Sequence, residues 1–240
     1  MPQHKLPNKN FDWTPELAYI IGLLTTDGNL SKDGRHIIMR SSDLQLLNTF
    51  KKCIGLKNKI AQTKNDSFAK RPCYKLQFGN VQLYRWLLKI GLFPAKSYTI
   101  GPLKIANQYF SDFLRGHLDG DGSIITYKDY YNTSKNPAYI YTRLYVCFRS
   151  ASKNHIEWLK GKTTKLYNIK GSIAEQKPRR KEQSTSIWIL RFAKKESIKL
   201  LLCIYYEKNL PCLKRKKIIA DKVLKLLSHQ KRKKYTKQKQ

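Results

Sequence analysis

The amino-acid sequence predicts an α+β fold built from two pseudo-symmetric halves. Two nine-residue segments, IIGLLTTDG at 20–28 and LRGHLDGDG at 114–122, share one pattern, an apolar helix that ends in Asp-Gly. After each segment the hydrophobic pattern changes in the same order, and we expect strand, strand, helix, strand, strand and helix to follow. Each half therefore has the predicted order αββαββα, and two copies of one unit can bring equivalent residues together about a twofold axis.

We expect the two repeated segments to be helices that pack closely against each other. Helical spacing puts one mostly apolar face on the second copy, made of Phe110, Phe113, Leu114, His117 and Leu118. Gly116 and Gly120 lie four residues apart on one side of this helix, where the first copy has Gly22 and Thr26. Glycine inside a helix costs about 1 kcal/mol relative to alanine. A close approach of the two helix backbones explains why it is present.

The next elements of the two halves match. They are a strand at 37–42 and a helix at 43–53 in the first half, and a strand at 139–149 and a helix at 152–166 in the second. Asp43 and Ser152 stand at the starts of these helices, where residues of their type act as N-caps.

The later elements also come in pairs. Strands are expected at 59–64, 73–78, 171–176 and 186–192, with basic loops at 65–72 and 177–185 between them, and helices at 81–90 and 195–206. A last helix at 214–227 is expected to pack on the body through Ile218, Ile219, Val223, Leu226 and Leu227. The chain thus divides into an N-terminal half at 13–93, a linker at 94–108, a C-terminal half at 109–228 and a basic tail at 229–240.

Each predicted motif helix ends in an unfavourably placed acid. Asp27 and Asp121 lie at the last turn, before glycines that are expected to stop the helices. A carboxylate there faces the negative end of the helix dipole, and two such ends side by side add like-charge repulsion. A divalent cation would offset both, and carboxylates with helix-end carbonyls suit Mg²⁺, which can support phosphodiester hydrolysis. Asp-Gly is also an ordinary turn, but its repetition after two matching helices favours the metal site.

The composition indicates a polyanionic partner. The chain has 240 residues, with 48 Lys and Arg against 16 Asp and Glu, a net charge of +32. So large an excess would repel itself unless a polyanion balanced it, and nucleic acid is the leading candidate. Disordered basic tails are the alternative, and the run KRKK at 231–234 fits it, but most Lys and Arg fall within the patterned body. Binding to DNA should weaken steeply with salt.

The cysteines and the hydrophobic pattern bear on the compartment. Cys53, Cys73, Cys147, Cys203 and Cys212 form no C-x-x-C pair, which favours reduced thiols inside a cell and argues against a zinc site. No apolar run approaches the roughly 20 residues needed to cross a membrane, and residues 1–13 lack the apolar stretch of a signal peptide. We therefore expect an intracellular, reducing compartment, either a prokaryotic cytoplasm or an organelle, and no membrane partner.

The two repeated segments resemble the motif of the LAGLIDADG homing endonucleases, in their single-chain, two-motif, monomeric form. The second copy matches closely apart from Arg115 and His117, and the first has Thr25 where the motif has its first acid. The resemblance implies that each half forms a curved antiparallel sheet, that the sheets form a DNA-binding saddle, and that the halves join at two packed motif helices. It covers nearly the whole chain, except residues 1–12 and those after 228.

The same resemblance implies an activity. The chain is expected to be an intron-encoded, site-specific DNA endonuclease, a hydrolase that makes a staggered break in a long, asymmetric double-stranded site. Its Mg²⁺, or another divalent cation such as Mn²⁺ or Ca²⁺, is expected at the carboxylates of Asp27 and Asp121 and the backbone carbonyls of Thr26 and Gly120. The family also has a basic residue near each scissile phosphate. Alignment selects Gln77 and Arg191, with Lys75 as a neighbour, although Gln77 carries no charge.

Alternation along the strands predicts which side chains meet DNA. On the strand at 139–149 the residues expected to face the core are Ile140, Leu144, Val146 and Phe148. A two-stranded ribbon fits the major groove, where Arg or Lys reads guanine and Gln reads adenine. The candidate contacts to bases or phosphates are Arg40, Lys75, Gln77, Arg143, Arg149 and Arg191. The solvated face of an antiparallel sheet explains any single one equally well, whereas the charge excess favours contact for the face as a whole.

Other functions remain open at this point. The main alternative is a maturase, a relative that binds intron RNA, or a binding protein that has lost cleavage; the intact acid pair favours cleavage. A nuclease domain from an intein is disfavoured because the chain starts at Met1 and ends in Lys-Gln-Lys-Gln, without splicing residues. A transcription regulator would need a helix-turn-helix, and no spare segment is long enough for one.

Overall fold

The computed structural model describes residues 11–63, 72–178 and 185–237. Its first half runs through α1 (Pro15–Thr26), β1 (Gly28–Leu30), β2 (His36–Ser41), α2 (Leu44–Cys53), β3 (Ile60–Thr63), β4 (Cys73–Gly79) and α3 (Val81–Ile90). Its second half runs through α4 (Phe110–Asp119), β5 (Ser123–Asp129), β6 (Tyr141–Ser150), α5 (Lys153–Tyr167), β7 (Ser172–Gln176), β8 (Ile187–Phe192) and α6 (Lys194–Ile204). The 3₁₀ turns η1 (Lys96–Tyr98) and η2 (Asn107–Tyr109) lie between the halves, and α7 (Lys214–Lys237) comes last.

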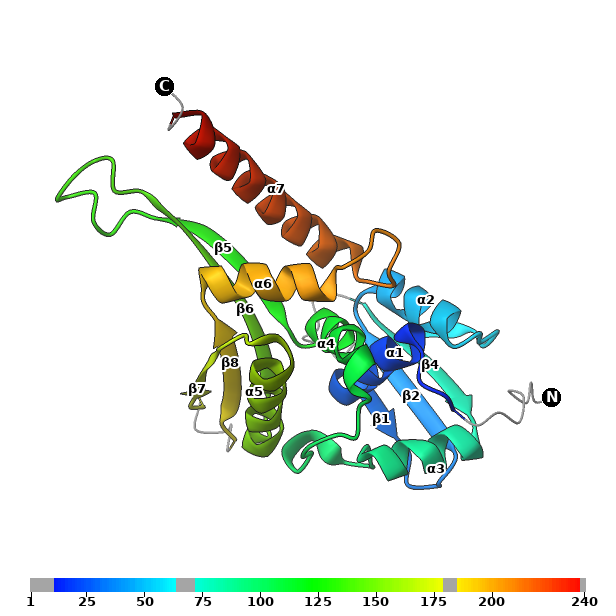
Figure 1. The fold of residues 1–240 in the computed structure, drawn as a ribbon. Coiled ribbons are helices and arrows are strands. Elements are labelled where there is room, and N and C mark those ends of the chain that lie inside the picture. Colours follow the sequence, from blue (N-terminus) through cyan, green and yellow to red (C-terminus); the bar gives the residue numbers. More distant parts are fainter. Residues whose placement is uncertain (1–10, 64–71, 179–184, 238–240) are drawn as a thin grey trace.

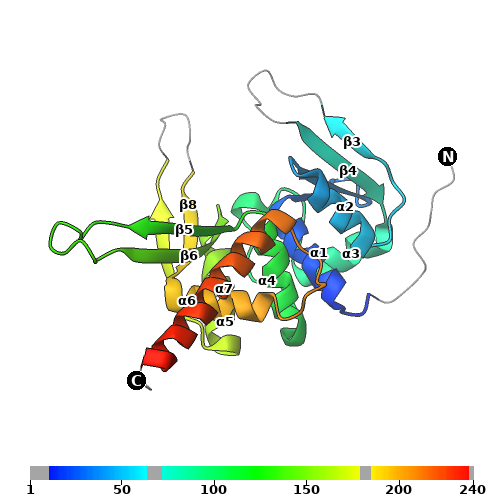
Figure 2. The same ribbon diagram turned by 90° about the horizontal axis from the view of Figure 1, so that it is seen from above.

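The predicted order αββαββα is present twice, and each copy forms its own sheet. Both sheets are antiparallel and four-stranded, with the orders β1-β2-β4-β3 and β5-β6-β8-β7. Figures 1 and 2 show the sheets on either side of a central pair of helices, α1 and α4, with the other helices packed around them. The predicted α+β class with two similar halves joined at the motif helices is confirmed. The greater parts of the basic loops expected at 65–72 and 177–185 lie outside the described residues.

The motif helices α1 and α4 approach so closely that side chains are excluded from their line of contact. A Cβ atom added to Gly22 would lie 2.2 Å from the carbonyl oxygen of Phe113. One added to Gly116 would lie 2.0 Å from the carbonyl oxygen of Tyr19. Real side chains do not tolerate such distances, because the atoms concerned belong to rigid helix backbones. The predicted reason for glycine at these positions is therefore confirmed.

Burial follows the predicted alternation along the strands, with one exception. Ile37 and Met39 on β2 and Val146 and Phe148 on β6 are fully buried. Ile140 was expected on the same core face as Phe148, but it is 47% exposed. That prediction was wrong because β6 begins only at Tyr141, on an arm that the β5–β6 hairpin extends beyond the body of the sheet (Figure 1).

Helix α7 is longer and less buried than the sequence pattern suggested. It continues past the expected end at 227 to Lys237 and projects from the body (Figure 1). No glycine or proline follows Leu227 to stop it. Ala220 and Val223 are buried, whereas Ile218 is 66% and Leu226 is 52% exposed, so the expected packing of these two side chains was wrong. The body covers only one face of the helix, and they lie on the other.

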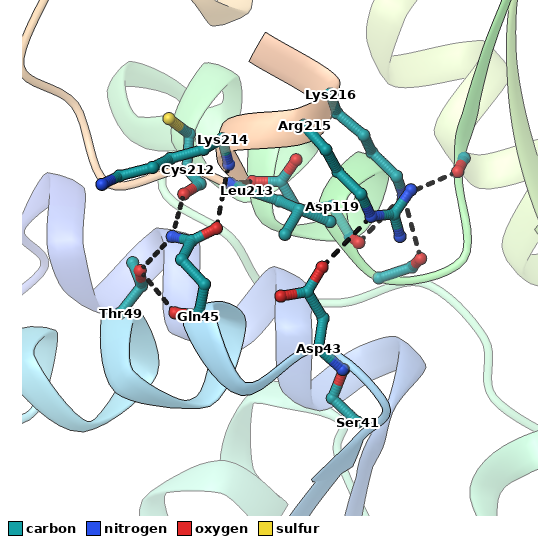
Figure 3. Close-up of polar contacts among 12 residues, drawn as sticks. Ser41, Asp43, Gln45, Thr49, Asp119, Cys212, Leu213, Lys214, Arg215 and Lys216 are labelled. Atoms are coloured by element: carbon teal, nitrogen blue, oxygen red, sulfur yellow. Dashed lines mark hydrogen bonds and ion pairs between the residues drawn. The ribbon is translucent and has the colours of Figure 1, made fainter. Parts of the chain in front are cut away.

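The two residues predicted as N-caps differ in the hydrogen bonds that their side chains make. The Ser152 hydroxyl accepts a hydrogen bond from the His155 amide at the start of α5, as expected. Asp43 stands at the N-cap of α2 without a capping bond from its side chain. Its carboxylate instead accepts a bond from the Nε of Arg215 on α7, at 3.1 Å (Figure 3). A partner from a distant element therefore outcompetes the local one.

Candidate metal and nucleic-acid site

The structure brings the two motif acids to one place at the ends of α1 and α4. Asp27 follows α1, and its amide donates to the carbonyl of Leu23 at 2.9 Å. Its Oδ2 lies 3.1 Å from the position that a Cβ on Gly120 would occupy. The acid of the first motif thus lies against the backbone of the second, one residue before Asp121. This juxtaposition follows from the close approach of the motif helices.

Both acids are held in an environment that favours the protonated form. Burial, followed by the charge of Asp121, raises the pKa of Asp27 to about 7. Burial also raises the pKa of Asp121. Charges on Lys96, Lys216 and Arg149 act in the opposite direction on Asp121. Two carboxylates kept together against this cost are typical of a functional site.

Two buried lysines bind the ends of the motif helices. The ammonium of Lys216, on α7, lies within hydrogen-bond distance of four carbonyl oxygens at the end of α4 and just after it. These distances are 2.5 Å to Leu118, 2.9 Å to Asp119, 3.1 Å to Gly120 and 2.8 Å to Gly122. Lys96, in η1, donates to the carbonyl of Gly28. The Lys216 ammonium therefore meets the negative end of α4, where a cation is stabilised, and the Lys96 ammonium lies at Gly28, two residues beyond the end of α1. Burial is the main cause that lowers the pKa of each lysine to about 8.

Sequence reasoning missed both lysines as site residues. The available signal was the echo between the segments LFPAK at 92–96 and LPCLK at 210–214, which places basic residues at equivalent points after each half. Lys96 belongs to the first segment, and Lys216 follows the second by two residues. The echo alone could not reveal that their side chains turn back to the motif helices, because those contacts span more than sixty residues.

A cavity of about 410 Å³ opens beside Asp121. Thr26 and Asp121 line it on the side of the motif helices, and Arg149 of β6 lines it on the side of the second sheet. The predicted ligand set consists of carboxylate and carbonyl oxygens, which suits a hard divalent cation. The Gly120 carbonyl already accepts from Lys216, but a carbonyl oxygen has a second lone pair. Among the described residues, no group of three or more His, Cys, Asp or Glu could hold a metal.

The third acid of the region, Asp119, holds elements of the fold together. Its Oδ2 accepts the Tyr19 hydroxyl at 2.9 Å. The same oxygen accepts the Leu213 amide at 2.7 Å (Figure 3). Burial is the main cause that raises the pKa of Asp119 to about 6. The side chain thereby joins α1, α4 and the segment before α7. Thr25, which replaces the corresponding first acid in the other motif, donates its hydroxyl to the Ile21 carbonyl within α1 at 2.7 Å.

The two unusual residues of the second motif are also buried. Arg115 donates to the carbonyls of Pro211 and Ile204, both at 2.9 Å, and to the carboxylate of Asp112 at 2.6 Å. It therefore ties α4 to the segment between α6 and α7. His117 contacts His155 of α5, with their Nε2 atoms 3.1 Å apart.

The residues predicted to contact DNA lie on the sheets at different distances from the acids. Arg40 pairs with Lys75 across β2 and β4, and Gln77 is the next outward position on β4. Arg40 and Gln77 are exposed, and Lys75 is half-buried. They form one polar stripe on the outer face of the first sheet.

In the second sheet the predicted residues do not form one cluster. Arg149 reaches the cavity at the acids, and Arg191 is exposed with its guanidinium carbon 5.4 Å from the centre of the Tyr145 ring. Arg143 lies out on the arm and forms an ion pair with Asp129 at 2.6 Å. Of the basic residues predicted from the sequence, Arg149 is the one that the structure places beside Asp121.

No protein-family model matches the sequence, and no curated protein matches it. Several solved structures are similar to this chain. The I-LtrWI LAGLIDADG homing endonuclease bound to target DNA superposes with a TM-score of 0.60 and 15% identity, over 90% of this chain and 91% of that one. The homing endonuclease I-WcaI bound to its DNA recognition sequence gives a TM-score of 0.56 and 14% identity, over 90% and 94%.

The chain has the LAGLIDADG fold. Full-length DUF199/WhiA from Thermatoga maritima shares this fold, with a TM-score of 0.53 and 16% identity over 91% of this chain, which spans 62% of the length of that protein. The resemblance inferred from the motifs is thus confirmed for the LAGLIDADG fold. At such identities the comparison establishes the fold and leaves the activity to be argued from the site. None of the described helices is long and apolar enough to cross a membrane.

Proposed function

We propose that this chain is a site-specific endonuclease that cleaves both strands of a long, asymmetric duplex DNA site with the help of a divalent cation. One observation carries the proposal. Asp27 and Asp121, at the ends of two copies of one helix, lie close enough for the charge of Asp121 to raise the pKa of Asp27, and the charges of Lys96 and Lys216 act on both. Asp121 also lines a cavity with Arg149. Acids and cations that perturb one another in a cavity are typical of catalytic sites.

The roles of the residues follow from their chemistry. Asp27 and Asp121 would hold the cation, Mg²⁺ by preference, together with the carbonyls of Thr26 and Gly120. A bound cation supplies an activated water and stabilises the leaving oxygen of a phosphodiester. Lys96 and Lys216 place positive charge next to the acids, where it attracts the DNA phosphates. Arg149 brings a guanidinium, which binds phosphate oxygens in a bidentate manner.

The two halves supply the DNA-binding surface. The proposed contacts are Arg40, Lys75 and Gln77 in the first half, and Arg143, Arg149 and Arg191 in the second; Gln77 and Arg191 remain the candidates near the scissile phosphates. Because the halves are not identical, a monomer would read an asymmetric site. The division at 13–93, 94–108 and 109–228 belongs to this proposal. So does a reducing intracellular compartment, which the five free cysteines favour.

The decisive experiment is a cleavage assay on plasmid libraries that carry randomised sites and intron-junction sequences, with Mg²⁺ and with EDTA. Wild type is compared with Asp27→Asn, Asp121→Asn and a control, Asp221→Asn, which makes the same change on α7 at a side chain that is 45% exposed. We expect linearisation by wild type and the control with Mg²⁺ only, and at least a hundredfold slower cutting by the two motif variants. Metal-independent cutting, or full activity of a motif variant, would refute the proposed site.

A second function is favoured by the arm of the β5–β6 hairpin. It carries exposed tyrosines, Tyr127, Tyr130, Tyr131, Tyr139 and Tyr141, of which Tyr131 is 87% exposed. Open aromatic faces beside basic residues suit stacking on unpaired bases, as in RNA binding. A maturase that binds intron RNA would show high-affinity binding to the RNA and no cutting of the junction DNA. Both measurements use the same protein preparation and separate the two functions.

A further inference from the structure

The segment between the halves carries Lys96 to the end of α1 and is then attached to the second half. Its backbone turns at Ala95, which has a left-handed conformation with φ 55°. The carbonyl of Lys96 accepts the amides of Thr99 at 3.0 Å and Ile100 at 2.8 Å. The position of the Lys96 ammonium therefore depends on what holds residues 99–101.

Two side chains at the start of α5 hold the carbonyls of that segment. The Ser152 hydroxyl donates to the Ile100 carbonyl at 2.5 Å. The Nδ1 of His155 lies 3.0 Å from the Gly101 carbonyl oxygen. Both side chains are buried, with Ser152 4% and His155 1% exposed. In this environment a broken bond leaves a polar group without a water partner.

The contact between His155 and His117 fixes the tautomer of both rings. A carbonyl can only accept, so the Nδ1 of His155 carries a proton and its Nε2 is an acceptor. The Nε2 of His117, 3.1 Å away, must then donate, and the Nδ1 of His117 is left as a buried atom without a hydrogen-bond partner. The rings are nearly coplanar, at 12°, with centres 5.3 Å apart, so the two Nε2 atoms face each other.

This geometry places a proton between the two Nε2 atoms. Two ring nitrogens 3.1 Å apart are at hydrogen-bond distance. Burial lowers the pKa of both rings, that of His155 to about 4. Lys96 and Lys216 also disfavour charge on the rings, and Asp121 and Arg149 face them across the cavity. Both imidazoles are therefore neutral.

We infer that His155 is a positioning residue for Lys96. Through its bond to the Gly101 carbonyl it fixes the segment that places the Lys96 ammonium at the Gly28 carbonyl. Its contact with His117 keeps the ring in the tautomer that donates to Gly101. The second half would thereby set the position of the lysine that serves the first. The value of this for catalysis rests on the proposed function, but the structural link does not.

The test measures how well Lys96 is protected from an amine-acetylating reagent, read by mass spectrometry without DNA or metal. Lys216 is the internal control, because it is equally buried, with each lysine 5% exposed, but is held by α7. Three variants dissect His155. His155→Phe removes both ring bonds, His155→Asn keeps a donor at the Nδ1 position, and His155→Gln keeps a polar group at the Nε2 position.

We expect Lys96 to react about tenfold faster in His155→Phe and His155→Gln, to remain near the wild-type rate in His155→Asn, and Lys216 to be unchanged in all three. Equal gains at Lys96 and Lys216 would mean general loosening and would overturn the inference. So would an unchanged Lys96 in His155→Gln, or equal rates in the Asn and Gln variants. The Asn and Gln pair keeps the test valid if His155→Phe does not fold. A failed cleavage assay leaves these readings unaffected.

Discussion

At the scale of single residues, the site is built from groups in unfavourable states. Asp27 and Asp121 are partly buried acids whose environment favours protonation. Lys96 and Lys216 are buried cations whose pKa values fall to about 8. The opposite charges offset part of the cost of burying each other. The negative end of α4 offsets a further part of the cost of burying Lys216. Removing the charge of Asp27 should therefore stabilise the fold, so that its role can be tested by stability as well as by activity.

Asp27→Asn is expected to stabilise the protein while abolishing cleavage. The folded-state pKa of about 7 lies above the ordinary value of 3.8, so the folded chain binds the proton more tightly than the unfolded chain. The penalty from the ionised acid therefore appears above about pH 4 and is complete above pH 7. At pH 8 we expect a gain of about 1–3 kcal/mol in the free energy of unfolding. Urea unfolding at pH 8 and pH 4 measures it, and the gain should vanish at pH 4.

Mg²⁺ supplies the control for that measurement. It should raise the melting temperature of wild type, because a ligand that binds only the folded state stabilises it. The increase should be absent in Asp27→Asn and present in Asp221→Asn. If Mg²⁺ stabilises Asp27→Asn as well as wild type, Asp27 is not a ligand.

His117→Leu is expected to reduce the loss of stability in acid. Leu23 occupies the equivalent position of the first motif, so the change suits the helix. Both imidazoles have folded-state pKa values below 6.5, so the unfolded chain takes up protons first. Their favourable contribution is present above about pH 6.5 and is lost as the pH falls toward 4. Between pH 7 and pH 5 the variant should lose about 1–2 kcal/mol less than wild type. An identical loss in the two proteins would contradict neutral burial of His117.

At the scale of elements, the molecule depends on the contact between α1 and α4. The contact is possible because glycines face each other, and it is reinforced by side chains that bridge helices, such as Asp119 to Tyr19. Gln45 of α2 adds a bridge to the segment before α7. It donates to the Cys212 carbonyl at 3.0 Å and accepts the Lys214 amide at 2.9 Å (Figure 3). The segment that delivers Lys216 is therefore held from both halves.

Gly116→Ala should be severely destabilising. The new Cβ would lie 2.0 Å from the Tyr19 carbonyl oxygen, so the helices must separate. We expect a loss of at least about 3 kcal/mol. Gly161→Ala on α5 is the matched control, because nothing lies within 4 Å of its Cβ position, and it should gain about 0.5–1 kcal/mol from helix propensity. Thermal unfolding of both variants measures the difference; a mild effect at Gly116 would contradict the close packing.

At the scale of the whole molecule, the charge of +32 and the two sheets on either side of the motif helices would govern the proposed DNA binding. Net charge of this size would make that association rapid and salt-dependent, whatever the sequence of the site. Sequence specificity would come from the outward side chains of the sheets and from the β5–β6 arm. The β5–β6 arm has no counterpart among the described residues of the first half. It therefore extends the surface on one side only (Figure 2).

Arg40→Ala should lower the salt dependence of DNA binding. Each phosphate contact contributes about −0.9 to the slope of log K against log salt concentration for duplex DNA. Loss of one contact should make the slope less negative by about one. Lys199→Ala is the control, since Lys199 pairs with Glu196 at 3.2 Å on α6, away from the strands' outward stripe. Fluorescence anisotropy at several salt concentrations measures both slopes; equal changes in the two variants would remove Arg40 from the proposed surface.

What the sequence alone determined are the features that depend on near neighbours in the chain. The repeated helix, the strand alternation, the Ser152 cap and the reason for the motif glycines all follow from local periods and spacings, so they were predictable. The tertiary structure alone decided which side chains meet. Lys96 reaches Gly28 across 68 residues, and Lys216 reaches Asp119 across 97. The Asp43 carboxylate bonds Arg215 in place of the helix cap, and Ile140 is exposed because it lies beyond the body of the sheet. Such partners depend on how packed elements are placed relative to one another, and no local pattern encodes that placement.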